Sequence, residues 1–413
     1  MIRRFVLFLV HAAVCAVALA SSGLAAGDDI VERGAYLANV GNCEGCHTAR
    51  GGAPFAGGKP MATPFGTFYA SNLTPDRDTG LGAWSSEDFW RAMHDGVSRG
   101  GRLLYPAFPY PNYTRVTRQD SDAIFAFLKT ITPRKQANRP HDLRLPFDQP
   151  WLLRLWRAMF FRAEPFAPDP SRSEQWNRGA YLARGLGHCD ACHAPRNWLG
   201  AVTKNDPEFD GGTIPEQKWY APSLHDPAQA GLAGWPRTEV ANLLRTGRST
   251  RATTSGPMAE IVARSMQHWN DKDMDALSEF LVTLPTRIRP RPRVESPNEK
   301  DPTWLRGKSL YGEHCKDCHG DQGQGRPGVF PALDGNRAVV MNPPANVVRI
   351  VLVGGYAPAT KFDSRPHGMP PFGQTLGDGD VASVVTYIRS AWSNRASPVS
   401  AAEANRVRGY GSD

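Results

Sequence analysis

Six of the seven cysteines lie in three pentapeptides of the form Cys-x-x-Cys-His, which end at His47, His193 and His319. Two thiols at this spacing can add to the two vinyl groups of one haem, and the histidine that follows is then held beneath the iron as an axial ligand. The motifs therefore predict three covalently attached haem c groups. The predicted attachment residues are Cys43, Cys46, Cys189, Cys192, Cys315 and Cys318.

Zinc binding and thiol redox chemistry are the two competing uses of closely spaced cysteines. A zinc site needs four clustered ligands, and a redox pair does not need the histidine. The repeated trailing histidine also argues against a disulfide framework. The seventh cysteine, Cys15, lies in the apolar N-terminal segment, so no cysteine outside that segment is left over.

The sixth ligand of each iron decides what a haem does, and methionine opposite histidine suits electron transfer because it closes the iron to substrates. Met369 stands in a loop just before the last predicted helix of the third repeat, and Met258 occupies the corresponding place in the second. Met266 and Met274 are expected to be core residues of the second repeat.

The first repeat breaks this pattern, because Phe108 stands where the second repeat has Met258, and a phenylalanine cannot bind iron. The nearest substitutes are His94, which we favour, then Met93, with Met61 third. His94 would give a bis-histidine haem of lower potential. An open five-coordinate iron is the remaining alternative, and it would be the one opening for catalysis.

A repeated arrangement of helices must position these residues. Each repeat opens with an Arg-Gly helix before its cysteines and closes with an amphipathic helix, whose apolar residues are spaced three and four apart. Helices ending at Gly96 and Gly247 are expected in the first two repeats. The closing helices are predicted over 119–130, 271–284 and 378–392.

These elements predict a mainly α fold of three tandem class I-like cytochrome c domains with long loops, each built around one covalent haem c. The N-terminal segment has a positive start, an apolar run and small residues, as a cleaved export signal does. The predicted segments are a signal peptide (1–26), domain 1 (27–132), a linker with an amphipathic helix (133–173), domain 2 (174–285), a Pro/Arg-rich linker (286–301), domain 3 (302–395) and a C-terminal tail (396–413).

The formal charge is mildly positive: +8 for the whole chain, or +6 without Arg3 and Arg4 of the signal. The charge is spread along the chain and no nucleic-acid motif is present, so we expect no nucleic-acid partner. The segment Trp151–Phe161 is predicted to form a helix with an aromatic and aliphatic face and with arginines on the opposite face. Such a helix can dock on a membrane or a partner, or pack between the first two domains.

The motifs Arg-Gly-Ala-Tyr-Leu, Tyr105–Tyr110, Gly256–Glu260 and Met369–Gly373 resemble those of the tri-haem cytochrome c subunits of periplasmic membrane-associated dehydrogenases. The resemblance covers essentially the whole mature chain. It implies a periplasmic subunit, peripherally attached to the inner membrane, that passes electrons from a catalytic dehydrogenase subunit to ubiquinone or a terminal oxidase. The catalytic subunits of this family are quinoproteins, flavin enzymes or molybdenum hydroxylase-type enzymes. Phe108 stands where alcohol-dehydrogenase cytochromes carry methionine and looks more like the molybdenum-associated form.

Two other functions stay open at this stage. One is a haem enzyme of the peroxidase or nitrite reductase type, which would use an open first haem. The other is a free-standing soluble electron shuttle. The sequence offers no catalytic triad, phosphate loop or paired acids, so we expect no catalytic residues and an electron carrier that is not an enzyme by itself.

Overall fold

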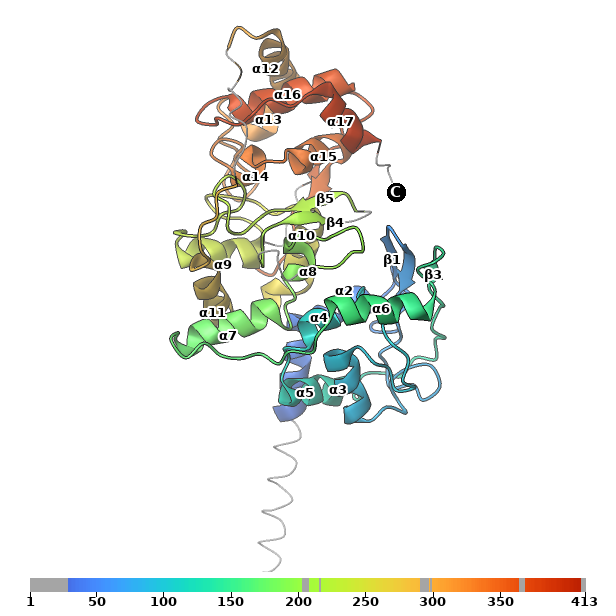
Figure 1. Ribbon diagram of the computed structural model, residues 1–413. Coiled ribbons are helices and arrows are strands. Elements are labelled where there is room, and N and C mark those ends of the chain that lie inside the picture. Colours follow the sequence, from blue (N-terminus) through green and yellow to red (C-terminus); the bar gives the residue numbers. More distant parts are fainter. Residues whose placement is uncertain are drawn as a thin grey trace, which may run out of the picture. The chain divides into compact units, whose positions relative to one another are not determined.

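The computed structural model describes residues 29–202, 208–214, 217–289, 297, 299–363 and 368–409 (Figure 1). The predicted signal peptide, 1–26, lies outside them. The chain is mainly helical and divides into two compact units. The smaller comprises Met1–Met61, Phe68–His141 and Ala163–Pro165, and the larger comprises Ala62–Thr67, Asp142–Arg162 and Phe166–Asp413. No helix in the described part of the chain has the length and hydrophobicity that crossing a bilayer requires.

The smaller unit holds the first Cys-x-x-Cys-His motif between two helices. Residues 29–40 form its opening helix, and the motif itself is helical. Ser85 begins α3 with a capping box, and Gly96 ends it in the left-handed region (φ 62°), as predicted. Its helices are α2 (Cys43–His47), α3 (Ser86–Asp95), α4 (Tyr110–Tyr113) and α5 (Arg118–Leu128). The strands β1 (Pro60–Thr63), β2 (Gly66–Tyr69) and β3 (Asp142–Leu143) form one small sheet, of which residues 62–67 and 142–143 are counted with the larger unit.

The larger unit includes α6 (Pro150–Phe160), the amphipathic helix predicted from the sequence. Leu153 is 7% exposed, and the indole N–H of Trp156 donates to the carbonyl oxygen of Leu199 over 3.0 Å. The region of the second motif follows. Its elements are α7 (Glu174–Arg184), α8 (Asp190–His193), β4 (Gly212–Ile214), β5 (Trp219–Ala221), α9 (Arg237–Thr246), α10 (Gly256–Arg264), η1 (Met266–His268) and α11 (Asp271–Val282).

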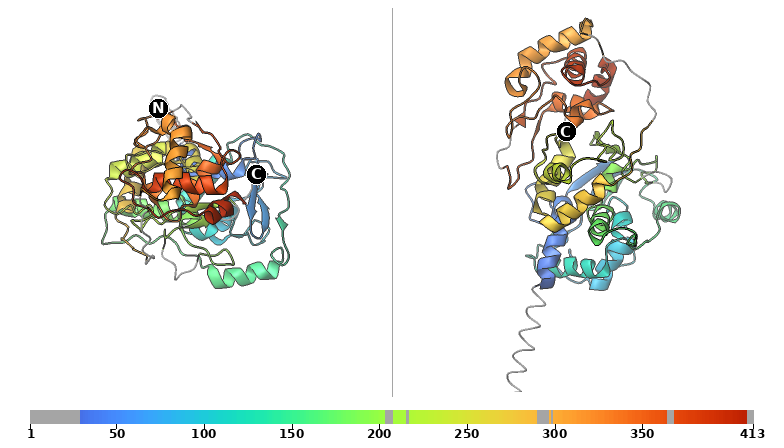
Figure 2. Two further views of the ribbon diagram at one scale, coloured as in Figure 1. Left: turned by 90° about the horizontal axis from the view of Figure 1, so that it is seen from above. Right: turned by 90° about the vertical axis from the view of Figure 1, so that its left-hand side faces the viewer.

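The third motif lies in the remainder of the same unit, where α12 (Pro302–His314) and α16 (Asp378–Ser390) lie side by side (Figure 2). The other elements here are α13 (Lys316–His319), α14 (Arg337–Val340), α15 (Ala345–Val353), β6 (Gly355–Tyr356), β7 (Gly368–Met369) and α17 (Ala401–Arg408). The hydrophobic core of this region includes Leu310, Val348, Val385 and Ile388.

The same helix crossing occurs at all three motifs. In each opening helix a glycine packs against the closing helix so closely that a Cβ would overlap a backbone carbonyl oxygen. The pairs are Gly34 with Ala123, Gly179 with Ala276, and Gly307 with Ser383. The arginine preceding each glycine bonds an aspartate of the closing helix. These pairs are Arg33–Asp120 at 2.6 Å, Arg178–Asp273 at 2.7 Å and Arg306–Asp380 at 3.0 Å.

The three closing helices predicted from hydrophobic periodicity are confirmed as α5, α11 and α16. The expected C-terminal tail is wrong in part, because α17 packs on α16 within 396–413. Ser400 and Glu403 form a capping box, and Ala404 is fully buried in the core. The eight residues of α17 are too few for their hydrophobic pattern to distinguish a helix from a loop.

Candidate haem-binding sites

The histidine of every motif is oriented by a backbone carbonyl. The Nδ1–H groups donate to the carbonyl oxygens of Ser71 (from His47, 2.7 Å), Pro222 (from His193, 2.8 Å) and Pro331 (from His319, 3.0 Å). Burial lowers the pKa of all three imidazoles, which favours the neutral ring. With Nδ1 carrying the proton, Nε2 keeps the lone pair that an iron ligand needs.

A glycine holds the backbone of each histidine from the other side. The amide N–H groups of Gly57, Gly211 and Gly325 donate to the carbonyl oxygens of His47, His193 and His319 at 2.7, 2.7 and 2.8 Å. All three glycines have positive φ, at 81°, 79° and 66°. A Cβ on any of them would lie 2.5 to 2.9 Å from the carbonyl carbon whose oxygen accepts from the histidine. Sequence reasoning missed these glycines, which stand at different distances from their motifs.

The first cysteine of each motif does not resemble a metal ligand or a redox thiol. Burial raises the pKa of Cys43 and Cys189 to about 12 and that of Cys315 to about 11, so these thiols are protonated. Within the described ranges, no three His, Cys, Asp or Glu side chains converge where one metal ion could sit. The donor set, two thiols three residues apart and a neutral imidazole with Nε2 available, fits a covalently attached haem.

The third motif shares its core with the predicted methionine. Met369 lies in β7, where it pairs with Gly355 of β6. Met369 and Cys315 both pack against the same hydrophobic cluster, together with Phe372 and Trp392. The structure therefore brings the first cysteine of this motif and Met369 to one core.

The second motif has its candidate methionine at the start of α10. Met258 is half-buried, and Gly256 beside it packs against the indole of Trp219 in β5. That strand leads directly to Pro222, the carbonyl partner of His193. Met266 and Met274 are 4% and 0% exposed, which confirms the prediction that they belong to the core.

In the first repeat, Phe108 contacts Tyr113, which lies close to the cysteines of the motif. The ring of Phe108 lies 5.3 Å from that of Tyr113. Burial raises the pKa of the Tyr113 hydroxyl well above its usual value, and the neighbouring Cys43 and Cys46 contribute to the shift. This loop thus reaches the first motif although it carries no methionine.

His94 and Met93 lie on different faces of α3. The His94 ring stacks on Trp90 at 4.6 Å, and its Nδ1–H donates to the Asp95 carboxylate at 2.8 Å. Met93 is 5% exposed and shares the buried face of the helix with Phe89. His94 therefore retains Nε2 for a further bond, whereas Met93 points into the core.

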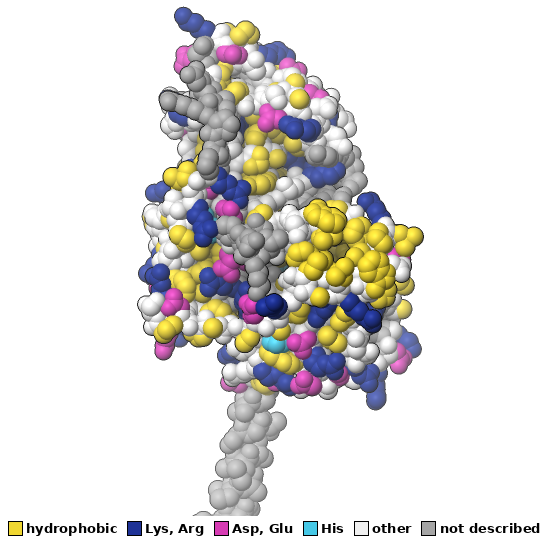
Figure 3. Space-filling view, viewed as in Figure 1, with side chains coloured by type: hydrophobic (Ala, Val, Ile, Leu, Met, Phe, Trp, Pro, Cys, Tyr) yellow, Lys and Arg dark blue, Asp and Glu magenta, His cyan; other side chains and the backbone are white. Residues whose placement is uncertain are grey.

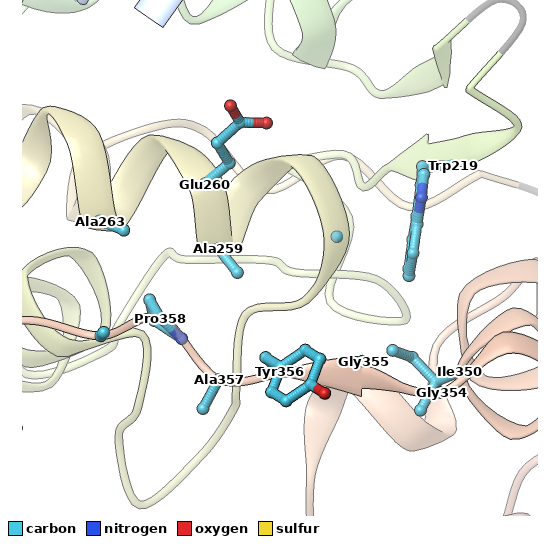
Figure 4. Close-up of a pocket in the computed structure, with 12 residues that line it drawn as sticks. Trp219, Ala259, Glu260, Ala263, Ile350, Gly354, Gly355, Tyr356, Ala357 and Pro358 are labelled. Atoms are coloured by element: carbon cyan, nitrogen blue, oxygen red, sulfur yellow. The ribbon is translucent and has the colours of Figure 1, made fainter. Parts of the chain in front are cut away.

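The regions of the second and third motifs meet at a cavity of about 330 Å³ (Figure 4). Trp219 of β5 forms one wall, and Ala259 and Ala263 of α10 form another. Ile350 of α15 and Tyr356 of β6 close it from the third-motif side. The cavity is thus bounded by the helix that carries Met258 and by the strand that pairs with Met369.

The helical fold and the three Cys-Cys-His sets define a c-type cytochrome. The family model described as "Cytochrome c" matches residues 31–132, and the model described as "Cytochrome C oxidase, cbb3-type, subunit III" matches residues 302–388.

The relatives of the chain define the family more narrowly. The chain is 37% identical to the gluconate 2-dehydrogenase cytochrome c subunit of Pantoea cypripedii, over 90% of this chain and 87% of that protein. It is 34% identical to the alcohol dehydrogenase (quinone) cytochrome c subunit of Gluconacetobacter polyoxogenes, over 95% and 88%. It is also 31% identical to the fructose dehydrogenase cytochrome subunit of Gluconobacter japonicus, over 92% and 83%. The chain belongs to the family of cytochrome c subunits of dehydrogenases, as its motifs predicted, and its role is electron transfer.

Proposed function

We propose that this chain carries electrons from a catalytic dehydrogenase subunit through three haem c groups, one in each of three cytochrome c domains. The observation that carries this proposal is the threefold repetition of one geometry: a Cys-Cys-His set whose imidazole donates through Nδ1 to a backbone carbonyl. A haem bound there supplies one-electron transfer when its iron is closed by a second axial ligand.

The second axial ligands in this proposal come from the chain itself. Met369 serves the third haem and Met258 the second. For the first haem, His94 is the candidate, because its Nδ1–H is already committed to Asp95 and Nε2 remains. Met93 is the next choice.

The haem count and the closure of the irons are tested on the purified holoprotein. Intact-mass spectrometry should show the mass of three haems added to the polypeptide, and reduced protein should not bind carbon monoxide at any of them. Fewer than three haems would contradict the count. Carbon monoxide binding at one haem, together with peroxide or nitrite turnover, would favour the haem enzyme instead.

The relatives support a catalytic dehydrogenase partner, because three of them are named as cytochrome subunits of dehydrogenases. The periplasm is the proposed location of this complex. Phe108 favours a molybdenum hydroxylase-type partner over a flavin enzyme or quinoprotein. Ubiquinone or a terminal oxidase is the proposed acceptor. Affinity purification of the chain from its own cells should recover a larger dehydrogenase subunit, whereas a chain recovered alone without detergent would favour the soluble shuttle.

Peripheral membrane contact is proposed through α6. Trp151, Leu155 and Met159 lie four residues apart on one stripe of this helix and are 58%, 47% and 52% exposed. Figure 3 shows hydrophobic side chains gathered over this part of the surface. From residue 149 to 162 the chain carries three arginines (Arg154, Arg157 and Arg162) and no acidic residue. An apolar stripe flanked by arginines suits an anionic lipid surface.

Vesicle flotation tests this contact. Holoprotein should float with vesicles that contain phosphatidylglycerol, and the triple variant Trp151→Ser, Leu155→Ser, Met159→Ser should remain in the dense fraction. Leu305→Ser is the matched control, because Leu305 is 50% exposed in α12 and should not affect flotation. Equal flotation of the triple variant and the wild type would exclude α6 as the lipid contact.

A further inference from the structure

An asparagine from the third-motif region binds the strand that leads to the second motif's histidine partner. The amide N–H of Tyr220 donates to Oδ1 of Asn346 at 2.9 Å, and Nδ2 of Asn346 donates to the carbonyl oxygen of Tyr220 at 2.8 Å. Tyr220 lies in β5, opposite Thr213 of β4. The Asn346 side chain thus occupies the place of a neighbouring strand's peptide group.

The bound strand is part of the support of His193. Two residues after Tyr220, the carbonyl oxygen of Pro222 accepts the Nδ1–H of His193. Beyond it, Oε1 of Gln229 accepts from the amide N–H of Ser223 at 2.6 Å and from the Tyr220 hydroxyl at 3.2 Å. Asn346 and Gln229 therefore fix the backbone on either side of the carbonyl that orients the imidazole.

Other contacts join the same two regions away from this strand. The amide N–H of Arg337 donates to the carbonyl oxygen of Arg251 at 2.9 Å, and that of Lys361 donates to Oε1 of Gln267 at 2.8 Å. Nδ2 of Asn336 donates to the Thr253 hydroxyl at 3.2 Å. The regions are thus held together at several points, and the Asn346 contact is the one of these that falls on the strand supporting His193.

We propose that Asn346 is a positioning residue for the second haem, although it belongs to the third repeat. By holding Tyr220, it keeps the Pro222 carbonyl aligned with His193 and so maintains the electron density that the imidazole gives to iron. A weaker Nδ1–H bond makes the imidazole a poorer donor, which disfavours the oxidised iron and raises the reduction potential. The potential of the second haem therefore depends on α15 of the neighbouring repeat.

Redox titration of the purified holoprotein tests this inference. Asn346→Leu keeps the side-chain size but loses both hydrogen bonds, and it should raise the midpoint potential of one haem while leaving the other two unchanged. That haem is assigned to the second motif by its absence from the titration of a Cys189→Ala, Cys192→Ala variant. Asn346→Gln keeps a neutral amide that can donate and accept, and it should show a smaller shift than Asn346→Leu.

The matched control is Asn336→Ala, which removes a contact between the same two regions without touching β5. It should leave the potential of the second haem at the wild-type value. An unshifted second haem in Asn346→Leu, or an equal shift in Asn336→Ala, would overturn the inference. Should Asn346→Leu fail to fold, the potential of Asn346→Ala decides, since this variant loses the same two hydrogen bonds without adding a charge and must still raise the potential.

This inference rests on the proposed attachment of a haem at each motif, and the two can fail separately. A haem count below three removes the proposed function itself. A full count with an unchanged second potential removes only the role of Asn346.

Discussion

Each motif histidine is fixed at two points, one on its ring and one on its backbone. The ring donates a hydrogen bond to a backbone carbonyl. The histidine's own carbonyl accepts from the N–H of a glycine, and this glycine packs against the carbonyl that holds the ring. At the second motif these partners are Pro222 and Gly211. Glycine is required there because φ is 79° and a Cβ would meet the Ser223 nitrogen at 2.5 Å.

Gly211→Ala should therefore destabilise the holoprotein by about 3 kcal/mol, since it adds a steric overlap to the cost of a left-handed backbone. Gly234→Ala is the control, because Gly234 has φ 76° with no atom within 4 Å of the place that a Cβ would take. Its expected cost is about 1 kcal/mol, from the backbone alone. Chemical denaturation followed by circular dichroism measures both, and equal losses would show that the overlap at Gly211 is relieved at no cost.

Met258→Ala and Met369→Ala should each convert one haem to a high-spin or water-ligated form with a lower potential, because a thioether ligand is lost. Absorption spectra and redox titration measure the change. Met266→Leu is the control, because this buried methionine lies in the core and a volume-conserving change should leave every haem as it was. A variant with unchanged spectrum and potential would remove that methionine from the ligand set.

The sequence predicted the residues whose chemistry depends on local spacing alone. Cys43, Cys46 and His47 could be proposed as one site because they are neighbours along the chain. Gly57, which donates to the His47 carbonyl, and Ser71, whose carbonyl accepts from the His47 ring, could not be predicted, because loops of different length in each repeat bring such residues to the histidine. The carbonyl acceptors carry no side-chain signal at all.

At the scale of helices, the crossing of the opening and closing helices determines how tightly each repeat packs. In α12, Gly307 approaches the carbonyl oxygen of Ser383 in α16, whereas Gly312 has open space where a Cβ would stand. Gly307→Ala should destabilise the protein by about 2 kcal/mol or more, because the helices must separate. Gly312→Ala should stabilise it by about 1 kcal/mol, because alanine is the better helix former.

Thermal unfolding of the two holoprotein variants measures this difference in a single helix. A stabilising effect of Gly307→Ala would contradict the close crossing. The opposite signs expected for two identical substitutions separate packing from helix propensity.

Helices with a long apolar stripe were predicted from the sequence, as α5, α11, α16 and α6 show. Their periodicity extends over three turns, which a single-sequence pattern can reveal. α17 was missed because it buries little more than Ala404 and Val407. The core that these residues contact is formed by distant segments and cannot be recognised from the sequence of α17. The orientation of α6 also depends on the Trp156–Leu199 hydrogen bond, which joins distant segments.

At the scale of the whole molecule, the second and third motifs share one compact unit and the first has its own. Calorimetry of the holoprotein should therefore show two unfolding transitions, because each unit is cooperative within itself. Gly34→Ala should lower only the transition of the smaller unit, and Gly307→Ala only that of the larger. Three independent transitions would contradict a cooperative larger unit.

The family and the threefold repeat were predicted from the sequence, because both can be recognised from short motifs of neighbouring residues. The grouping of two repeats into one unit was not, since it depends on contacts such as Asn346 with Tyr220 that follow no local pattern. The sequence placed a linker between these two repeats, where the described residue Arg289 in fact bonds Asp210.

The hydrogen bonds between Asn346 and Tyr220 also indicate where the chain is best divided. A truncated form of this chain, made to carry electrons to an electrode, should keep the second and third repeats on one polypeptide. Cutting between them would remove Asn346 from the outer edge of β5, and an exposed strand edge favours aggregation. A junction near Phe166, where the larger unit resumes, avoids that edge.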